Sequence, residues 1–323
     1  MKRALITGIN GQDGSYLADF LLSKGYDVWG TLKRNSVSEN QSSRINEDTF
    51  SRINLEYADM TDMSSLIRVL QLCKPDEIYN LAAQSHVRIS FDQPVYTTEV
   101  VAIGTLNLLE AARVICPKVR IYQASSSEMF GNNIDEDGYQ RETTPMSPVS
   151  PYGCAKVYAY NICKNYRNSY NMFISNGILF NHESPRRGTN FVTNKIVKEA
   201  VKIKKGLSNK LVLGNLNASR DWGHAKDYVR AMWLILQHET TDDFVCSTGV
   251  SHTVRELVEY TFNKLELDWK QYVKYDKKYC RPEELNNLKG DCSKAQTELG
   301  WEHEYTFESM IDEMIEYWLN KYN

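Results

Sequence analysis

The sequence predicts an α/β fold in which a parallel β-sheet is covered by helices on both faces. Two observations support this prediction. Short β-rich runs alternate with helical patterns through the first 180 residues, and a glycine-rich turn joins the first run to the first helix. Strands and helices that alternate at this spacing are joined by right-handed crossovers. The expected architecture is therefore a doubly wound, Rossmann-like sheet.

The elements of the first half follow from the apolar pattern. A β-rich run comes first, and Tyr16, Leu17 and Phe20 then share one face of a helix that Gly25 ends. Strands are expected at residues 3–7, 27–32, 54–57, 77–81, 119–124 and 172–179. Helices are expected between them at 12–24, 62–73, 97–114 and 152–170. The polar stretch 33–52 is too long for a routine connection.

After residue 179 the regular alternation decays. Helical patterns recur at 191–204, 226–238, 254–264 and 307–320, separated by irregular stretches rich in Asn, Arg, Asp and Gly. This pattern favours a smaller, discontinuous C-terminal lobe. We expect residues 1–180 and 224–248 to form the sheet domain, and residues 181–223 and 249–323 to form the lobe.

Composition narrows the class of protein. The 323 residues are 42% hydrophobic with a net charge of −3, which favours neither nucleic acid nor a membrane as partner. The seven cysteines are an odd number without metal-ligand spacing, so we predict no metal site and a reducing compartment. No apolar stretch approaches the roughly 18 residues that span a bilayer. We therefore expect a cytoplasmic protein.

A phosphate-binding turn is indicated directly after the first strand. Its residues are Gly8, Asn10, Gly11, Gln12, Asp13 and Gly14. Glycines three apart permit a tight turn and close backbone approach, and the helix N-terminus presents free N–H groups to an anion. A sharp turn with no ligand is the alternative. Because the turn lies between a strand and a helix, we favour dinucleotide binding.

The end of the second strand indicates which dinucleotide is bound. NAD-binding proteins place an acidic residue about 20 positions after the glycines, and this chain has Arg34 there, with Lys33 and Ser36 beside it. A guanidinium suits a 2′-phosphate, which favours NADP. The alternative is that these are solvated loop charges. Asp59 is expected near the adenine, and the crevice of the sheet is expected at Leu81, Ala82, Ala83, Gln84 and Ser85.

A catalytic group is predicted near the fifth strand. Tyr152 and Lys156 are four residues apart and so share one face of a helix. A nearby ammonium lowers the pKa of a phenol and lets it act as a base. Ser126 follows the fifth strand, where its hydroxyl can bind the substrate oxygen that is oxidised.

Together the glycine turn, the Ser-Ser-Ser-Glu run and Tyr-x-x-x-Lys resemble the extended short-chain dehydrogenase/reductase family. Within it the chain is similar to the GDP-mannose 4,6-dehydratase branch. The blocks that carry this resemblance are 7–17, 83–87, 127–131, 180–188 and 220–229. Ser126 stands where that branch usually has Thr, and Asn194 where it tends to have Arg.

The resemblance implies a role for each site residue. Tyr152, aided by Lys156, takes the proton of the sugar 4-hydroxyl, and Glu128 removes the C5 proton and helps expel the 6-hydroxyl as water. The cofactor NADP is assigned Asn35, Met60, Tyr96, His182 and Arg187 besides the residues named above. The GDP-sugar is assigned Ser85, Ser126, Glu128, Tyr152, Asn181, Lys195, Gly214, Arg220, Arg281 and Glu284. The sheet domain is thus expected to bind NADP, and the lobe the nucleotide-sugar.

Three alternatives remain open from the sequence. A GDP-manno-heptose 4,6-dehydratase would share the reaction, and a nucleotide-sugar 4-epimerase would lack the role of Glu128. A non-catalytic NADP-sensing module would not need Ser126, Tyr152 and Lys156. The resemblance also implies a homodimer, or a homotetramer built as a dimer of dimers. Val100, Val101, Ile103, Leu108, Val157, Tyr160 and Ile162 are the apolar residues expected at its helix-pairing contact.

Overall fold

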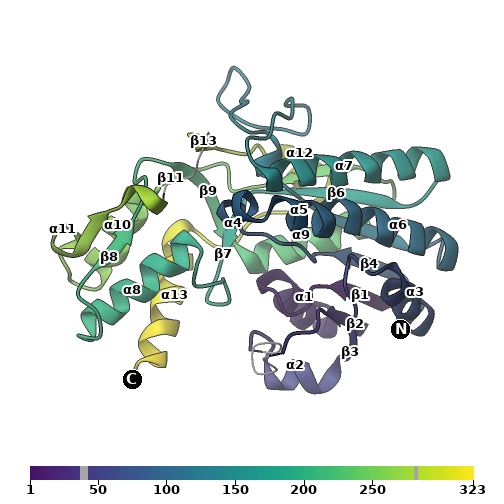
Figure 1. Cartoon of the computed structure of the whole chain (residues 1–323), viewed down its shortest axis with the longest axis horizontal. Helices are drawn as coiled ribbons and strands as arrows, with labels where there is room; N and C mark the ends of the chain where they lie inside the picture. The colour runs from purple at the N-terminus through teal and green to yellow at the C-terminus, as the bar shows by residue number, and fades with distance from the viewer. Residues whose placement is uncertain (37–42, 280–282) are drawn as a thin grey trace.

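A seven-stranded sheet forms the centre of the molecule (Figure 1). The computed structural model describes residues 1–36, 43–279 and 283–323. The strands are β1 (Arg3–Thr7), β2 (Asp27–Leu32), β3 (Asn54–Tyr57), β4 (Glu77–Asn80), β5 (Arg120–Ser126), β6 (Ile174–Leu179) and β10 (Asp243–Cys246). They lie in the order β10-β6-β5-β4-β1-β2-β3, and every pairing is parallel. The predicted parallel sheet is confirmed.

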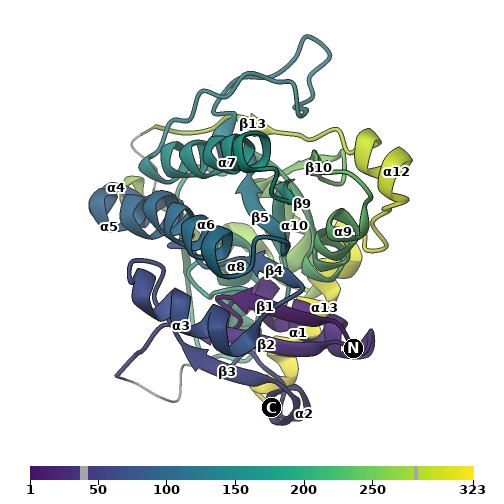
Figure 2. The same cartoon turned by 90° about the vertical axis from the view of Figure 1, so that its right-hand side faces the viewer.

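Helices cover both faces of this sheet, as Figure 2 shows. One face is covered by α3 (Met63–Cys73), α6 (Gly104–Ile115) and α7 (Pro151–Tyr170), which share a core with β1, β4, β5 and β6. The other face carries α1 (Gln12–Ser23), α9 (Ala225–Gln237) and α12 (Ser293–Leu299). Because both faces are covered, β4 and β6 are buried along their whole length.

Side-chain caps fix where the site-bearing helices begin. The Ser150 hydroxyl accepts the Gly153 N–H at 3.0 Å, and Pro151 occupies the first helical position of α7. The Asp62 carboxylate accepts the N–H groups of Ser64 and Ser65 at the start of α3. These caps fix the residues at which α7 and α3 begin.

The single helix expected at 97–114 is divided in the structure. It consists of α5 (Pro94–Thr98), a π-helical turn at Glu99–Ile103 and α6. The turn keeps Val100 and Val101 buried, and Leu108 in α6 is buried as well. The monomer core thus takes up most of the apolar residues expected at a subunit contact on this helix. Ile103 remains 43% exposed.

A smaller lobe lies beside the carboxyl edge of the sheet (Figure 1). Its core is built by α8 (Val192–Lys204), β8 (Leu211–Leu213), α10 (Val254–Lys264), α11 (Trp269–Tyr272), β12 (Val273–Tyr275) and α13 (Phe307–Lys321). Short strands β7 (Asn181–Glu183), β9 (Ser219–His224), β11 (Ser251–Thr253) and β13 (Asn287–Leu288) pair around β9. The sequence did not predict these strands, because most are two or three residues long and show no alternation.

The chain passes between sheet and lobe several times, and after β10 it leaves again for β11, comes back to the sheet at α12 and ends in the lobe at α13. β7 begins two residues after β6 ends, so the chain passes directly from the sheet to the lobe. It returns from β9 through α9 to β10, which pairs with β6 at the sheet edge. No helix in the described part of the chain is long and apolar enough to cross a membrane.

Candidate active site

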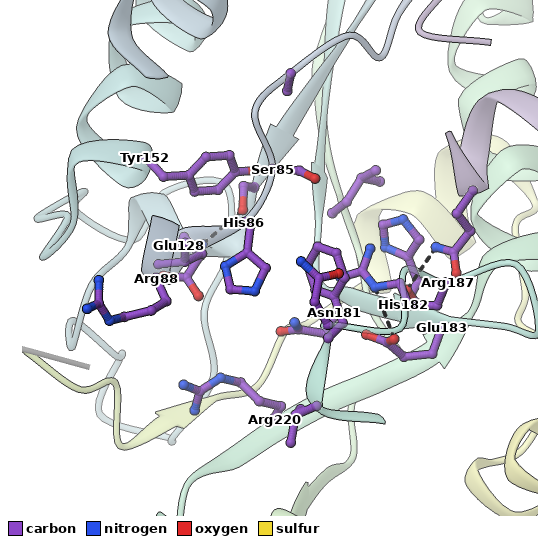
Figure 3. A pocket seen from close by; sticks show the side chains of 18 of the residues that line it. Ser85, His86, Arg88, Glu128, Tyr152, Asn181, His182, Glu183, Arg187 and Arg220 are labelled. Carbon is purple, nitrogen blue, oxygen red and sulfur yellow. Dashed lines mark hydrogen bonds and ion pairs between the residues drawn. The ribbon is translucent and has the colours of Figure 1, made fainter. Parts of the chain in front are cut away.

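A cleft of about 1000 Å³ opens between the carboxyl edge of the sheet and the lobe (Figure 3). The structure brings most of the predicted site residues together in it. From the sheet domain these are Gly8, Asn10, Gly11, Gln12, Asp13, Gly14, Leu81, Ala82, Ala83, Ser85, Ser126, Glu128, Tyr152 and Lys156. From the lobe and its junction these are Asn181, His182, Arg187, Lys195, Gly214, Arg220 and Glu284.

The remaining predicted cofactor residues lie outside this cleft. Arg34, Asn35 and Ser36 are exposed and follow β2, the strand that pairs with β1. Asp59 and Tyr96 meet at Lys33, whose Nζ is 3.0 Å from the Asp59 carboxylate and 3.1 Å from the Tyr96 hydroxyl. The predicted residues outside the cleft therefore gather at the carboxyl end of β2, the strand beside β1 and its glycine turn.

Two predicted cofactor residues have structural partners. Met60 is buried, and its carbonyl accepts a hydrogen bond from Asn107 at 2.9 Å. The Gln84 side chain accepts the His86 N–H at 2.7 Å and donates to Thr97 at 3.1 Å. Gln84 thereby fixes the loop after β4. Arg281 lies outside the described residues.

The glycine turn has the shape that a pyrophosphate requires. A Cβ added at Gly14 would lie 2.5 Å from the Gly8 carbonyl oxygen and 2.6 Å from the Ile9 Cα, so only glycine fits. The first turn of α1, which has no side-chain cap, therefore packs directly on the turn after β1. Its N–H groups have no partner within the helix, which leaves them available to an anion. The residues present thus fit a dinucleotide.

A buried ion pair links this turn to the lobe. The Nε2 atom of His182 lies 2.8 Å from the Asp13 carboxylate, and its Nδ1 atom lies 2.8 Å from the Phe180 carbonyl oxygen. Since both partners accept hydrogen bonds, the imidazole carries a proton on each nitrogen. Burial lowers the pKa of His182, but the Asp13 carboxylate outweighs burial and raises it. The pair is neutral overall and ties β7 of the lobe to the first turn of α1.

The Ser, Tyr and Lys side chains converge at the ends of β5 and α7. Ser126 is the last residue of β5, and Tyr152 and Lys156 lie one turn apart on α7, all three buried. Lys156 donates to the Ala124 carbonyl at 2.7 Å, and its Nζ is 5.7 Å from the centre of the Tyr152 ring. This arrangement can bind a sugar hydroxyl and remove its proton.

Burial dominates the titration of these groups. It raises the pKa of Tyr152 to about 12, although a hydrogen bond with Ser126 acts in the opposite direction. Burial also lowers the pKa of Lys156 to about 8. The sequence led us to expect that Lys156 would lower the phenol pKa. In the structure the loss of solvation dominates, and the contacts that lower the pKa of Tyr152 come from Ser126 and Arg187.

Glu128 lies two residues after Ser126, in a 3₁₀ turn at Ser127–Met129. Its N–H donates to the Ser126 hydroxyl at 3.3 Å, and its side chain is buried at the cleft. A Cβ at Gly153 would lie 2.8 Å from the Glu128 carbonyl oxygen, so glycine lets α7 approach this turn closely. Glu128 and Tyr152 therefore occupy the same wall of the cleft, as Figure 3 shows.

The opposite wall carries groups suited to a nucleotide diphosphate. Arg220 is buried, donates to the Leu285 carbonyl at 3.0 Å and pairs with Glu284 at 3.1 Å. Lys195 donates to the Val212 carbonyl at 2.6 Å and lies 3.8 Å from the centre of the Tyr279 ring. Among the described residues no group donates a hydrogen bond to the buried Asn181 Oδ1 atom, so it can accept one from a ligand.

Sequence reasoning missed several lining residues. His86, Arg88, Glu183, Phe191 and Tyr279 all line the cleft. His86 and Glu183 stand inside the recognised blocks 83–87 and 180–188, so the signal was present, but no role was assigned to them. Phe191 and Tyr279 reach the cleft from the lobe, whose short strands carry no sequence pattern.

The fold and the site define the class of protein. A glycine turn after β1, a buried Ser–Tyr–Lys group after β5 and a lobe over the carboxyl edge are the features of an extended short-chain dehydrogenase/reductase. Comparison with known proteins then gives the family. A model described as GDP-mannose 4,6 dehydratase matches residues 5–314. The chain belongs to the GDP-mannose 4,6-dehydratase family.

Curated relatives agree with this assignment. GDP-mannose 4,6 dehydratase 2 of Arabidopsis thaliana is 53% identical over 98% of this chain and 86% of its own length. The GDP-mannose 4,6 dehydratase of Homo sapiens is 47% identical over 97% of this chain and 90% of its own. The GDP-mannose 4,6-dehydratase of Vibrio cholerae is 47% identical over 97% of this chain and 93% of its own length.

Solved structures share the fold at lower identity. A UDP-glucose 4-epimerase from Thermus thermophilus in complex with NAD has a TM-score of 0.85 at 23% identity, with 98% of each chain covered. A dTDP-glucose 4,6-dehydratase from Streptomyces venezuelae with NAD bound has a TM-score of 0.83 at 24% identity, with 98% of this chain and 96% of that chain covered. These likenesses confirm the Rossmann-type fold.

Proposed function

We propose that this protein converts GDP-mannose to GDP-4-keto-6-deoxymannose. The observation that carries the proposal is the placement of Glu128 on the same cleft wall as Tyr152 and Lys156. A Ser–Tyr–Lys group alone supports oxidation of a hydroxyl. A buried carboxylate beside it adds a base for the proton next to the new ketone, which elimination of water requires.

The residues act in order along the sugar. Ser126 holds the 4-hydroxyl, and Tyr152 takes its proton with support from the Lys156 ammonium, while hydride leaves C4. The resulting ketone acidifies the C5 proton, which Glu128 removes, and the 6-hydroxyl leaves as water. Hydride then returns to C6 and a proton returns to C5 from Glu128. When bound, the cofactor supplies the hydride acceptor and donor for these steps, and its cationic nicotinamide ring favours ionisation of Tyr152.

The cofactor is NADP under this proposal. The glycine turn and the first turn of α1 bind the pyrophosphate, and the His182–Asp13 pair holds the lobe against that turn. Arg34 and Ser36, at the end of β2, bind the 2′-phosphate. An arginine there is compatible with the phosphate, whereas the carboxylate typical of NAD-binding chains would repel it.

The lobe binds the GDP portion of the substrate. Arg220, oriented by Glu284, neutralises the diphosphate, and Lys195 adds a second cation. Asn181 accepts a hydrogen bond from the substrate through its buried Oδ1 atom. Residues 1–180 and 224–248 act as the NADP-binding domain in this proposal, and residues 181–223 and 249–323 as the nucleotide-sugar lobe, except that α12 packs on the sheet.

The chain acts as a cytoplasmic homodimer or homotetramer in this proposal. Ile103 is 43% exposed and Tyr158 is 39% exposed, on neighbouring elements of the same sheet face. Two such faces related by a two-fold axis would bury both residues. Sedimentation velocity with and without NADP⁺ tests this. A dimer or tetramer is expected, and a monomer at micromolar concentration would exclude both assemblies.

A substitution at Glu128 tests the proposed reaction. Wild-type protein with GDP-mannose and NADP⁺ should yield a 4-keto-6-deoxy product. Glu128→Gln keeps the size of the side chain but removes the base, so it should oxidise C4, accumulate enzyme-bound NADPH and lose dehydration by about 100-fold or more. Normal dehydration by this variant would remove Glu128 from the mechanism.

A further inference from the structure

Several passages of the chain between the sheet and the lobe meet at one point beside β9, which runs between the two (Figure 1). The chain leaves the sheet through Phe180 after β6 and again through Ser247 after β10. It comes back through Gly290, which lies between β13 and α12. A Cβ added at Gly290 would lie 2.5 Å from the Ser247 Cβ and 2.7 Å from the Phe180 ring. These three passages therefore pack directly on one another.

Asp221 in β9 joins two of these passages to its own strand. One of its carboxylate oxygens accepts the backbone N–H of Thr248 at 2.9 Å and the Thr248 hydroxyl at 2.7 Å. The other oxygen accepts the N–H of Gly249 at 2.9 Å and that of Gly290 at 3.4 Å. The side chain is fully buried, so the carboxylate depends on these donors in place of water. Asp221 thus fixes the segment after β10 and the segment before α12 against β9.

The residue before Asp221 belongs to the cleft. Neighbouring residues of a strand point to opposite faces, so Arg220 extends into the cleft while Asp221 lies outside it (Figure 3). Glu284, which pairs with Arg220 at 3.1 Å, stands on the segment that leads through β13 to Gly290. β13 pairs with β9 in parallel. Asp221 therefore holds both members of the Arg220–Glu284 pair, one through its own strand and the other through Gly290.

We propose that Asp221 is a positioning residue that holds Arg220 and Glu284 at the diphosphate of the nucleotide-sugar. The identity of that ligand rests on the proposed function. Asp221 acts through Arg220 and takes no part in the chemistry of the sugar. A charged carboxylate is needed, because each of its oxygens meets two donors. An asparagine would turn its NH₂ group toward at least one backbone N–H in either orientation.

Asp221→Asn tests this role with little change of shape. With NADPH in place of NADP⁺ the sugar cannot be oxidised, so calorimetry with GDP-mannose reports binding alone. We expect the affinity for GDP-mannose to fall about 10-fold or more, because hydrogen bonds to a charged group are lost. The affinity for NADP⁺ should stay within about 3-fold of wild type. In turnover, KM for GDP-mannose should rise while kcat changes little, as expected for a loss of binding that is uniform along the reaction.

Two further variants separate this role from a general loss of structure. Asp227→Asn is the matched control, since Asp227 is also buried and accepts a backbone N–H, from Tyr305 at 3.1 Å, but lies outside the cleft in α9. It should keep GDP-mannose affinity within about 3-fold of wild type. Thr248→Val removes one of the four donors and should cause a smaller loss of affinity than Asp221→Asn. Combined with Asp221→Asn, it should add little further loss, and fully additive losses would contradict the proposal.

The pH dependence of binding is a measurement that a purely structural side chain would not change. Burial raises the pKa of Asp221 to about 6, although the hydrogen bonds from Thr248, Gly249 and Gly290 lower it. Above this pH the carboxylate accepts all four hydrogen bonds, and below it one oxygen carries a proton and becomes a donor. The difference in GDP-mannose affinity between wild type and Asp221→Asn should therefore be large at pH 8 and narrow as pH falls through about 6.

The other titratable and charged groups near Asp221 are retained in the variant. Burial raises the pKa values of Tyr228 on α9 and Cys292 before α12, and the Asp221 carboxylate adds to this effect, so both groups stay neutral in this range. His182 on β7 stacks on Tyr228 at 4.5 Å between ring centres, and Arg220 precedes Asp221 on β9. Because Asp221→Asn keeps all of these groups, a difference that changes with pH belongs to Asp221.

Each result decides the assignment. Thermal unfolding establishes that the variants fold. Unchanged GDP-mannose affinity in folded Asp221→Asn, an equal loss in Asp227→Asn, or a difference that stays constant between pH 5 and pH 8 would overturn the role of Asp221. Wild-type protein that binds GDP-mannose with NADPH but does not dehydrate it with NADP⁺ would contradict the proposed function, and the loss of affinity in Asp221→Asn would still support its role in binding.

Discussion

Gly14→Ala tests the close contact between α1 and the turn after β1. The added Cβ would lie 2.5 Å from the Gly8 carbonyl oxygen, whereas ordinary contact begins at 3.4 Å. Both partners are backbone, so α1 must move away from the turn. The N–H groups that receive the pyrophosphate would move with it, and a hydrogen bond to a charged group contributes about 1.5–3 kcal/mol. We therefore expect NADP⁺ to bind about 10- to 100-fold more weakly.

Gly177→Ala in β6 is the matched control for this experiment. Its added Cβ would also be too close to a neighbour, at 2.4 Å from the Tyr122 hydroxyl, but at a residue that does not line the cleft. Titration calorimetry with NADP⁺ should give an affinity within about 3-fold of wild type for this variant. Thermal unfolding establishes that both variants fold. Unchanged NADP⁺ affinity in folded Gly14→Ala would refute the assignment of this turn to the pyrophosphate.

Two further predictions address the cofactor and stability. In binding titrations, Arg34→Ala should lower the affinity for NADP⁺ about 10- to 100-fold and leave the affinity for NAD⁺ nearly unchanged. The control Arg52→Ala on α2 (Glu47–Arg52) should change neither affinity. Equal losses for both cofactors with Arg34→Ala would contradict the 2′-phosphate site. Burial raises the pKa of Glu313, but contacts with His224 and Lys226 outweigh burial and lower it from 4.5 to about 2. The contribution of Glu313 to the free energy of unfolding is therefore complete above pH 4.5 and is lost as pH falls toward 2. In denaturant unfolding, Glu313→Gln should lower the free energy of unfolding by about 1–3 kcal/mol at pH 7 and by less at pH 3. A difference that does not depend on pH would contradict this prediction.

The sheet domain could be predicted because its signals are local. β1 is a short β-rich run that is buried except at its first residue, and α1 and α7 have regular apolar faces with clear starts. The glycine turn and the Tyr-x-x-x-Lys pair also have fixed spacing, so their placement in one cleft follows from the parallel topology. β10 was not predicted, because four residues after a helix do not show which sheet edge they join.

The lobe and much of its site could not be predicted from local pattern. β7, β9 and β13 pair across long sequence separations, and β7 and β13 have too few residues to show alternation. The contact between His86 and Phe191 joins residues more than 100 positions apart, so it exists only after the lobe has folded over the sheet. The Ser126, Tyr152 and Lys156 positions were predictable, but the effect of burial on their pKa values was not, because burial depends on the whole cleft.

Transfer of hydrogen from C4 to C6 within one sugar is the central claim of this account. The direct measurement is to incubate the purified protein with NADP⁺ and GDP-[4-²H]mannose, and to locate deuterium in the product by mass spectrometry and NMR. The account predicts a 4-keto-6-deoxy product that carries the deuterium at C6. A 6-deoxy product whose C6 hydrogen comes only from solvent, a C4 epimer, or unconverted sugar would contradict it.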